Sequence, residues 1–278
     1  MTRQLRAALS CALLAVAVVT PLHARQSRAV ADTSVDAIVE RAAEYVKSYR
    51  QELTYVMATE RSVQKLRAGL PIYDVEETLA SDVYFVYVPS DKVWMAIRDV
   101  EVADGKTLKE RENVRAILDS GKAGAARELK EKNARYNLGS IVRNFNEPTL
   151  ALLVLDDDHR SRVTFVKQKT SGSRVVVSFV ERMPPTLISN VDGTPARSKG
   201  EFTIDAATGR IEASTLSVRL GKVDATLTTT YRSDAKLGIW VPARFDELYV
   251  EDSKRGERVT GQSLYSDYTR FDVQVRIK

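Results

Sequence analysis

The second half of the chain carries only strand patterns, and this feature constrains the fold most. From residue 159 onward, runs rich in β-branched and aromatic residues follow one another at 162–169, 174–182, 201–204, 210–220, 223–232, 240–251 and 257–271. Short turns join them, such as Asp205 to Gly209, where the glycine is predicted to take a left-handed φ. Parallel strands need long crossovers that usually contain a helix, and no helical pattern intervenes here. This half is therefore predicted to be an antiparallel sheet.

The first half begins with a helix and then changes to strands. Between residues 32 and 53, Val35, Ile38, Val39, Ala42, Val46, Tyr49 and Leu53 recur at three- and four-residue steps. This spacing predicts an amphipathic helix packed on the sheet, with Thr33 and Asp36 as a capping box at its start. Strands are predicted at 54–66, 77–88 and 93–102, and Asp104-Gly105 predicts a hairpin turn.

Helical segments separate these strands from the second half. They are expected at 111–118 and 123–136, and a third is expected to begin with Asn146 as its cap and Pro148 in its first turn. The body of the third helix, at 149–155, is almost wholly apolar. Such a helix is either buried on all sides or covers an apolar ligand.

Taken together, these patterns predict an α+β protein that is mostly antiparallel β. We expect an incomplete, half-open β-barrel or a strongly curved sheet of about ten strands, capped by helices. No linker or shift in composition divides residues 32–278, so we expect one domain with a helical insert at about 111–155.

The N-terminal segment predicts export from the cytoplasm. Arg3 and Arg6 precede an apolar run at 7–22, and a small-residue pattern ends at Ala31. We expect a signal peptide at 1–31, cleaved after Ala31 or else after Ala24; the alternative is an uncleaved membrane anchor. The mature protein is then periplasmic or secreted.

Cleavage would also change the composition. The lone cysteine, Cys11, would be removed, leaving 278 − 31 = 247 residues without a thiol, so thiol catalysis and thiolate metal sites are excluded. Four arginines and no acidic residue lie within 1–31, so the remaining balance is 38 − 37 = +1. Nucleic acid is not expected as a partner, because it attracts strongly basic surfaces.

The residues give little support for catalysis. His159 would be the single histidine after cleavage, and no G-x-S-x-G motif exists to use it. Asp156, Asp157 and Asp158 precede it, but consecutive carboxylates diverge and lack the spacing of a calcium loop. We therefore expect no catalytic residue, no metal and no cofactor.

One alternative for catalysis stays open. Asp99 and Glu101, two residues apart on a predicted strand, could serve an exported hydrolase.

Three stretches in the last third resemble a known family. They are Gly200-Glu201-Phe202-Thr203-Ile204-Asp205 with Thr208-Gly209-Arg210-Ile211, then Leu237-Gly238-Ile239-Trp240-Val241-Pro242, and finally Tyr265-Ser266-Asp267-Tyr268-Thr269-Arg270-Phe271. With the order of predicted elements, they resemble the outer-membrane lipoprotein carrier and receptor superfamily (LolA/LolB-like). That resemblance implies an incomplete β-barrel capped by helices.

The leading functional hypothesis is a non-enzymatic protein that holds an apolar ligand, an acyl chain or a lipidated protein, between its curved sheet and a helical lid. The candidate lining residues are Leu150, Leu153 and Val154 from the lid, with Tyr84, Val86 and Phe179 from strands. The alternative is an interaction or sensing module that binds another envelope protein. Candidate partners are thus a lipid, a lipoprotein or an envelope protein, with at most peripheral membrane contact.

Overall fold

The computed structural model describes residues 32–69, 72–88, 93–109, 113–119, 122, 124–143 and 145–271. The predicted signal peptide and both of its cleavage points lie outside the described residues. Everything below concerns the unit that begins at Asp32.

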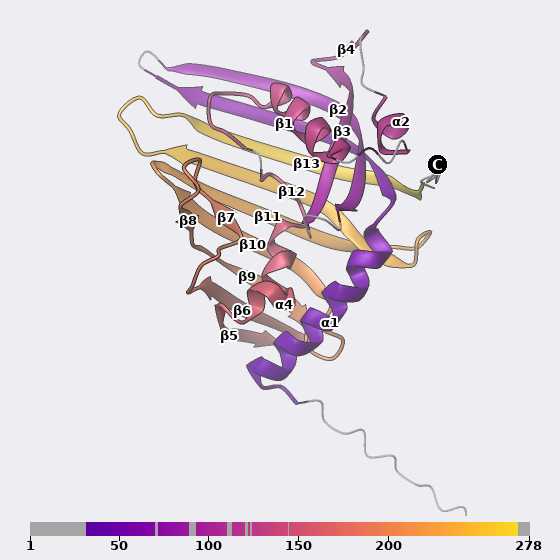
Figure 1. The fold of residues 1–278 in the computed structure, drawn as a ribbon, viewed down its shortest axis with the longest axis vertical. Coiled ribbons are helices and arrows are strands. Elements are labelled where there is room, and N and C mark those ends of the chain that lie inside the picture. The colour runs from indigo at the N-terminus through magenta and orange to yellow at the C-terminus, as the bar shows by residue number, and fades with distance from the viewer. Residues whose placement is uncertain are drawn as a thin grey trace, which may run out of the picture. The chain divides into compact units, whose positions relative to one another are not determined.

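Eleven strands form one antiparallel sheet in the order β4-β3-β2-β1-β13-β12-β11-β10-β9-β6-β5 (Figure 1). Their bounds are β1 Val56–Ala68, β2 Tyr73–Val88, β3 Val93–Ala103, β4 Lys106–Thr107, β5 Val163–Ser171, β6 Arg174–Glu181, β9 Ser198–Asp205, β10 Ile211–Leu220, β11 Val223–Asp234, β12 Ile239–Glu251 and β13 Arg258–Arg270. A separate two-stranded hairpin joins β7 Ile188–Ser189 to β8 Pro195–Ala196. The edge strands β4 and β5 do not pair with each other, so the sheet is curved but not a closed barrel. The predicted fold class is confirmed.

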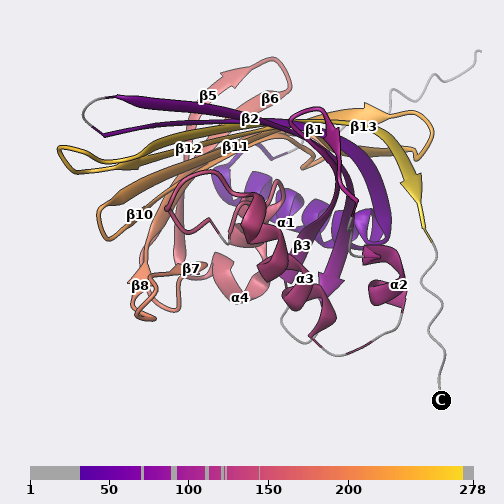
Figure 2. The same cartoon turned by 90° about the horizontal axis from the view of Figure 1, so that it is seen from above.

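The first helix, α1 Val35–Leu53, lies under the arch of the sheet, as Figure 2 shows. Its predicted apolar stripe is buried from Ile38 to Leu53 and packs against strand residues such as Phe85 and Phe245. The predicted capping box is wrong, because Ser34 is the N-cap and its hydroxyl accepts from the Ala37 amide at 3.3 Å. Asp32 in turn accepts from the Ser34 amide.

The insert between β4 and β5 contains α2 Val114–Asp119, α3 Ala125–Asn133, η1 Ala134–Tyr136, η2 Leu150–Leu155 and α4 Asp157–Arg160. The third predicted helix is a 3-10 helix, and Asn146 does not cap it. Instead Asn146 is buried and accepts a hydrogen bond from Lys130 at 3.1 Å. All six residues of η2 are buried, as expected for one of the two alternatives for an apolar helix.

Side chains of the insert cap the outer edge of β3. Glu147 accepts from the backbone amide of Ala96 at 2.5 Å, and Asn133 accepts from that of Arg98 at 2.8 Å. Beyond these residues β4 pairs with β3 only at Val102 and Ala103. Unpaired strand edges attract other strands, so these two acceptors occupy amides that would otherwise be open to pairing.

Two predicted turns are present. Asp104 and Gly105 take φ values of 47° and 73° between β3 and β4, as expected for a hairpin. Gly209 takes a φ of 74°, and a Cβ placed there would lie 2.2 Å from the carbonyl oxygen of Arg41 in α1. The turn before β10 therefore packs directly on the helix.

Candidate functional site

The concave face of the sheet changes from apolar to polar along β1. Val56 and Ala58 face the helix, but the next inward residues are Glu60, Ser62 and Gln64, and all of them are buried. Buried polar groups need partners to offset the loss of water. The partners come from β3, from β12 and β13, and from the insert.

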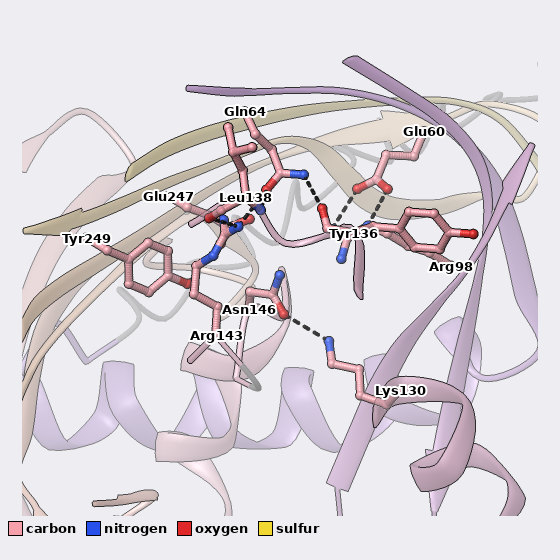
Figure 3. Close-up of polar contacts among 10 residues, drawn as sticks. All are labelled: Glu60, Gln64, Arg98, Lys130, Tyr136, Leu138, Arg143, Asn146, Glu247 and Tyr249. Carbon is pink, nitrogen blue, oxygen red and sulfur yellow. Dashed lines mark hydrogen bonds and ion pairs between the residues drawn. The ribbon is translucent and has the colours of Figure 1, made fainter. Parts of the chain in front are cut away.

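Glu60 is paired with Arg98 on the neighbouring part of this face. The guanidinium of Arg98 donates to both carboxylate oxygens, at 2.5 and 2.9 Å (Figure 3). Burial by itself raises the pKa of Glu60, but the Arg98 charge and the hydrogen bonds from Arg98 outweigh it and lower that pKa. The carboxylate therefore stays charged inside the protein.

A second polar group surrounds the buried side chain of Arg143 (Figure 3). The guanidinium of Arg143 donates to the Gln64 side chain at 2.6 Å and to the Leu138 carbonyl at 3.0 Å, and it lies 3.9 Å from the Glu247 carboxylate. Tyr249 donates to the same Glu247 at 2.8 Å, and burial followed by that negative charge raises the pKa of the phenol. These contacts fix the segment at 138–143 against the sheet.

A third contact joins α3 to the segment before η2. Lys130 lies 2.6 Å from Glu147, and both side chains are nearly buried. Because Glu147 also accepts from the edge of β3, this ion pair ties helix, strand and segment together.

A cleft of about 1270 Å³ lies beside Lys130 and Glu147. One wall is the segment at 140–150, a second is the β7–β8 hairpin, and the β10–β11 turn lies between them. Its apolar lining residues are Trp94, Met95, Ile141, Val142, Phe145, Leu150, Leu187, Ile188, Val191, Leu220, Val223 and Tyr249. Val142 is 62% exposed and Val191 is 95% exposed, so apolar surface reaches solvent on both of the facing walls.

Both walls are anchored by buried or half-buried carboxylates. Glu257 accepts from the amides of Ser140 at 2.7 Å and Ile141 at 3.3 Å. On the other wall Glu181 accepts from the amides of Leu187 and Ser198, both at 2.8 Å. These two residues flank the β7–β8 hairpin. The cleft is therefore a formed feature with fixed walls.

The structure brings one predicted site residue, Leu150, to the cleft. Leu153 and Val154 lie in the main core with α1, and Phe179 stacks on Phe202 at 5.0 Å. Tyr84 and Val86 lie in a separate cluster with Ile97, Val114, Leu129 and Phe271. The structure thus does not gather the six candidates at one place, and their contact with a ligand stays a prediction.

Several cleft residues belong to segments that carry no strand or helix pattern in the sequence. Ile141 and Phe145 lie between predicted helices, and Leu187, Ile188 and Val191 lie between the strands predicted at 174–182 and 201–204. The available signal was Val191 itself, an apolar residue within the polar turn Asn190 to Gly193.

The other candidate groups lie apart from the cleft. Asp156 forms an ion pair with Arg50 and lies between η2 and α4, and Asp157 and Asp158 are in the first turn of α4. Burial lowers the pKa of His159, despite the nearby charges of Asp156 and Glu181. Within the described part of the chain, no group of acidic and histidine side chains is arranged to hold a metal ion.

Asp99 and Glu101, the carboxylate pair considered for a hydrolase, lie where β3 has an irregular register on β2. The register of β3 on β2 shifts at Glu101, since Val100 lies opposite Ser81 and Val102 lies opposite Ala80. The simple two-residue alternation from Asp99 is interrupted there. Neither carboxylate lines the cleft.

No helix among the described residues combines the length and apolar character needed to cross a membrane.

Comparisons with known proteins find likeness only among solved structures. No family model matches the chain, and no curated protein matches it in sequence. A domain described as an outer membrane lipoprotein-sorting protein, from Vibrio parahaemolyticus, is 13% identical, with 86% of this chain and 95% of that chain covered and a TM-score of 0.35. A LolA superfamily protein from Nitrosomonas europaea is 13% identical over 87% and 95% of the two chains, with a TM-score of 0.30.

A third likeness is to a DUF1329 family protein from Desulfovibrio piger. It is 11% identical over 88% of this chain and 95% of that chain, with a TM-score of 0.33. The LolA-like resemblance identified from the sequence therefore reappears among solved structures as a distant likeness. At TM-scores this low, these similarities carry no argument about ligand or partner.

Proposed function

We propose that this chain is a non-enzymatic, extracytoplasmic protein that binds an apolar ligand, an acyl chain or an acylated protein, in the cleft between residues 140–150 and the β7–β8 hairpin. The observation that carries the proposal is the cleft itself. Ligand pockets typically measure about 300–1,000 Å³, and this one reaches about 1270 Å³ with a largely aliphatic and aromatic lining.

The surrounding chemistry supports the same function. The polar groups at the inner end of the cleft, Lys130 and Glu147, are already paired with each other. A ligand entering there meets few unpaired charges, and the remaining gain comes from burying apolar surface at about 25 cal/mol per Å². The export signal predicted for residues 1–31 supports a function outside the cytoplasm.

The test is binding of a fluorescent fatty-acid probe to the protein without residues 1–31. Ser189 is exposed and lines the cleft, so Ser189→Trp fills cleft space without removing a core contact. Ser171 is exposed at the end of β5 and lies outside the cleft lining, which makes Ser171→Trp the matched control.

We expect wild type and Ser171→Trp to bind the probe alike, and Ser189→Trp to bind at least about tenfold more weakly at an unchanged melting temperature. A tenfold change corresponds to about 1.4 kcal/mol. Wild-type protein that ignores every acyl probe would overturn the proposal and favour the interaction module, for which the exposed Val142 and Val191 would then be the contact residues.

A further inference from the structure

Exposed apolar side chains gather at one end of the sheet. Among the described residues eight large hydrophobic side chains are exposed, and four of them lie in or beside turns at this end. They are Ile72 at 56%, Tyr73 at 60%, Val142 at 62% and Val191 at 95% exposed. Binding that removes such apolar surface from water is favourable in free energy.

Hydrogen bonds and strand register place these turns near one another. Arg67, beside the β1–β2 turn, pairs with Arg258 at the start of β13. The amide of Asp252 donates to the carbonyl of Lys222 at 2.7 Å, which joins the β12–β13 turn to the β10–β11 turn. Figures 1 and 2 both show these hairpin tips at the left end of the sheet, with the β7–β8 hairpin below them.

The charged groups of this end leave cations available on its surface. Lys222, Lys254, Arg255 and Arg258 are exposed, and no described side chain pairs with them. The acids beside them have partners. Asp224 and Asp252 both contact Arg219, and Glu257 accepts from the 140–141 amides.

Cationic and acidic residues at this end are similar in number, so the summed field is weak. The expected attraction to phosphates is therefore a contact effect at short range.

From this arrangement we propose that the hairpin-tip end, defined by Ile72, Tyr73, Val142 and Val191 with the cations of the neighbouring turns, docks on the surface of a lipid bilayer. The four apolar side chains enter the headgroup region, and the cations contact lipid phosphates. A tyrosine with its ring in the apolar zone and its hydroxyl in water suits this boundary.

The spacing of these residues favours a bilayer over a folded protein partner. A protein interface needs a contiguous, shape-matched area with a buried centre. Here the apolar side chains stand on three separate segments, with Ile72 and Tyr73 beside the β1–β2 turn, Val142 in the insert and Val191 between β7 and β8. A fluid surface can receive each segment independently. Docked this way, the cleft between Val142 and Val191 opens toward the lipid.

The test is sedimentation with vesicles of phosphatidylcholine, alone or with one fifth phosphatidylglycerol, using the chain without residues 1–31. The double variant is Ile72→Asp/Tyr73→Asp, which changes two exposed residues outside the cleft lining, so folding is expected to be retained and is checked by melting temperature. The matched control is Val166→Asp/Leu264→Asp, which adds the same two charges at exposed apolar residues of β5 and β13.

We expect wild type and the matched control to bind both vesicle types, more tightly with phosphatidylglycerol, and the double variant Ile72→Asp/Tyr73→Asp to partition at least about tenfold less. High salt should reduce only the increment that phosphatidylglycerol gives. Wild type that stays in the supernatant with both vesicles, or a double variant that binds as wild type does, would overturn the proposal. Fatty-acid probe binding measured on the same samples separates the two proposals, because neither Ile72 nor Tyr73 lines the cleft.

Discussion

The guanidinium of Arg98 on β3 donates to both oxygens of the fully buried Glu60 carboxylate on β1, across the intervening strand β2. Removing one partner would leave a buried charge unpaired, which typically costs about 3–5 kcal/mol. We expect Glu60→Ala to destabilise the protein by that amount in urea unfolding. The double change Glu60→Leu/Arg98→Met should recover most of the loss, because it removes both charges. Equal losses in the single and double variants would show that the pair is not the cause.

The same pair predicts a pH dependence of stability. The pKa of Glu60 is lowered in the folded protein, so its contribution is complete above the unfolded value of about 4.3 and is lost as pH falls through the folded pKa. The difference in unfolding free energy between wild type and Glu60→Gln should therefore shrink on acidification below about pH 4. Urea titrations between pH 7 and pH 3 check this, and a difference that does not change with pH would contradict it.

Leu153 offers a test of the buried 3-10 helix. Its side chain is buried in the main hydrophobic core, so Leu153→Glu places a carboxylate among apolar side chains, and we expect an unfolded or degraded protein. Val191→Glu, the same change at a residue that is 95% exposed, should fold normally. Circular dichroism melts on both variants decide; a folded Leu153→Glu with an ordinary melting temperature would mean that η2 can lift away from the core.

Gly209 predicts a steric effect beyond its backbone conformation. Gly209 and Gly238 share a positive φ, which costs an L-residue about 1–2 kcal/mol. Only Gly209 also lies against α1, whereas a Cβ at Gly238 meets nothing within 4 Å. Gly209→Ala should therefore lower the melting temperature clearly more than Gly238→Ala, and equal shifts would show that the helix yields.

The sheet could be predicted because its information is local. Alternation in β1, the Asp104-Gly105 turn and the glycine at 209 each depend on a few neighbouring residues, and all of them are present as expected. Even the three buried polar residues Glu60, Ser62 and Gln64 fit the alternation of one strand. That strand alone gives no sign that Arg98 and Arg143 would reach them.

The cleft could not be predicted, because its walls are made by tertiary contacts. The sequence around Ser140 does not indicate that its amide donates to Glu257, a residue more than a hundred positions later. The apolar run at 149–155 gave an ambiguous signal, since a helix that covers a ligand and one that is buried on all sides have the same composition. Hydrogen bonds from Thr229 and Tyr231 to the Pro148 carbonyl hold that run in the core.

The side chains of Glu147 and Asn133 accept hydrogen bonds from β3, so the insert takes the place that a further strand would have beside β3. They satisfy the amides of Ala96 and Arg98 without presenting a new row of open amides beyond them. At this part of β3 the sheet therefore ends with two side chains in the place where another strand would pair. A shortened protein without residues 113–149 would regain a template for strand addition, and self-association through β3 would be its natural outcome.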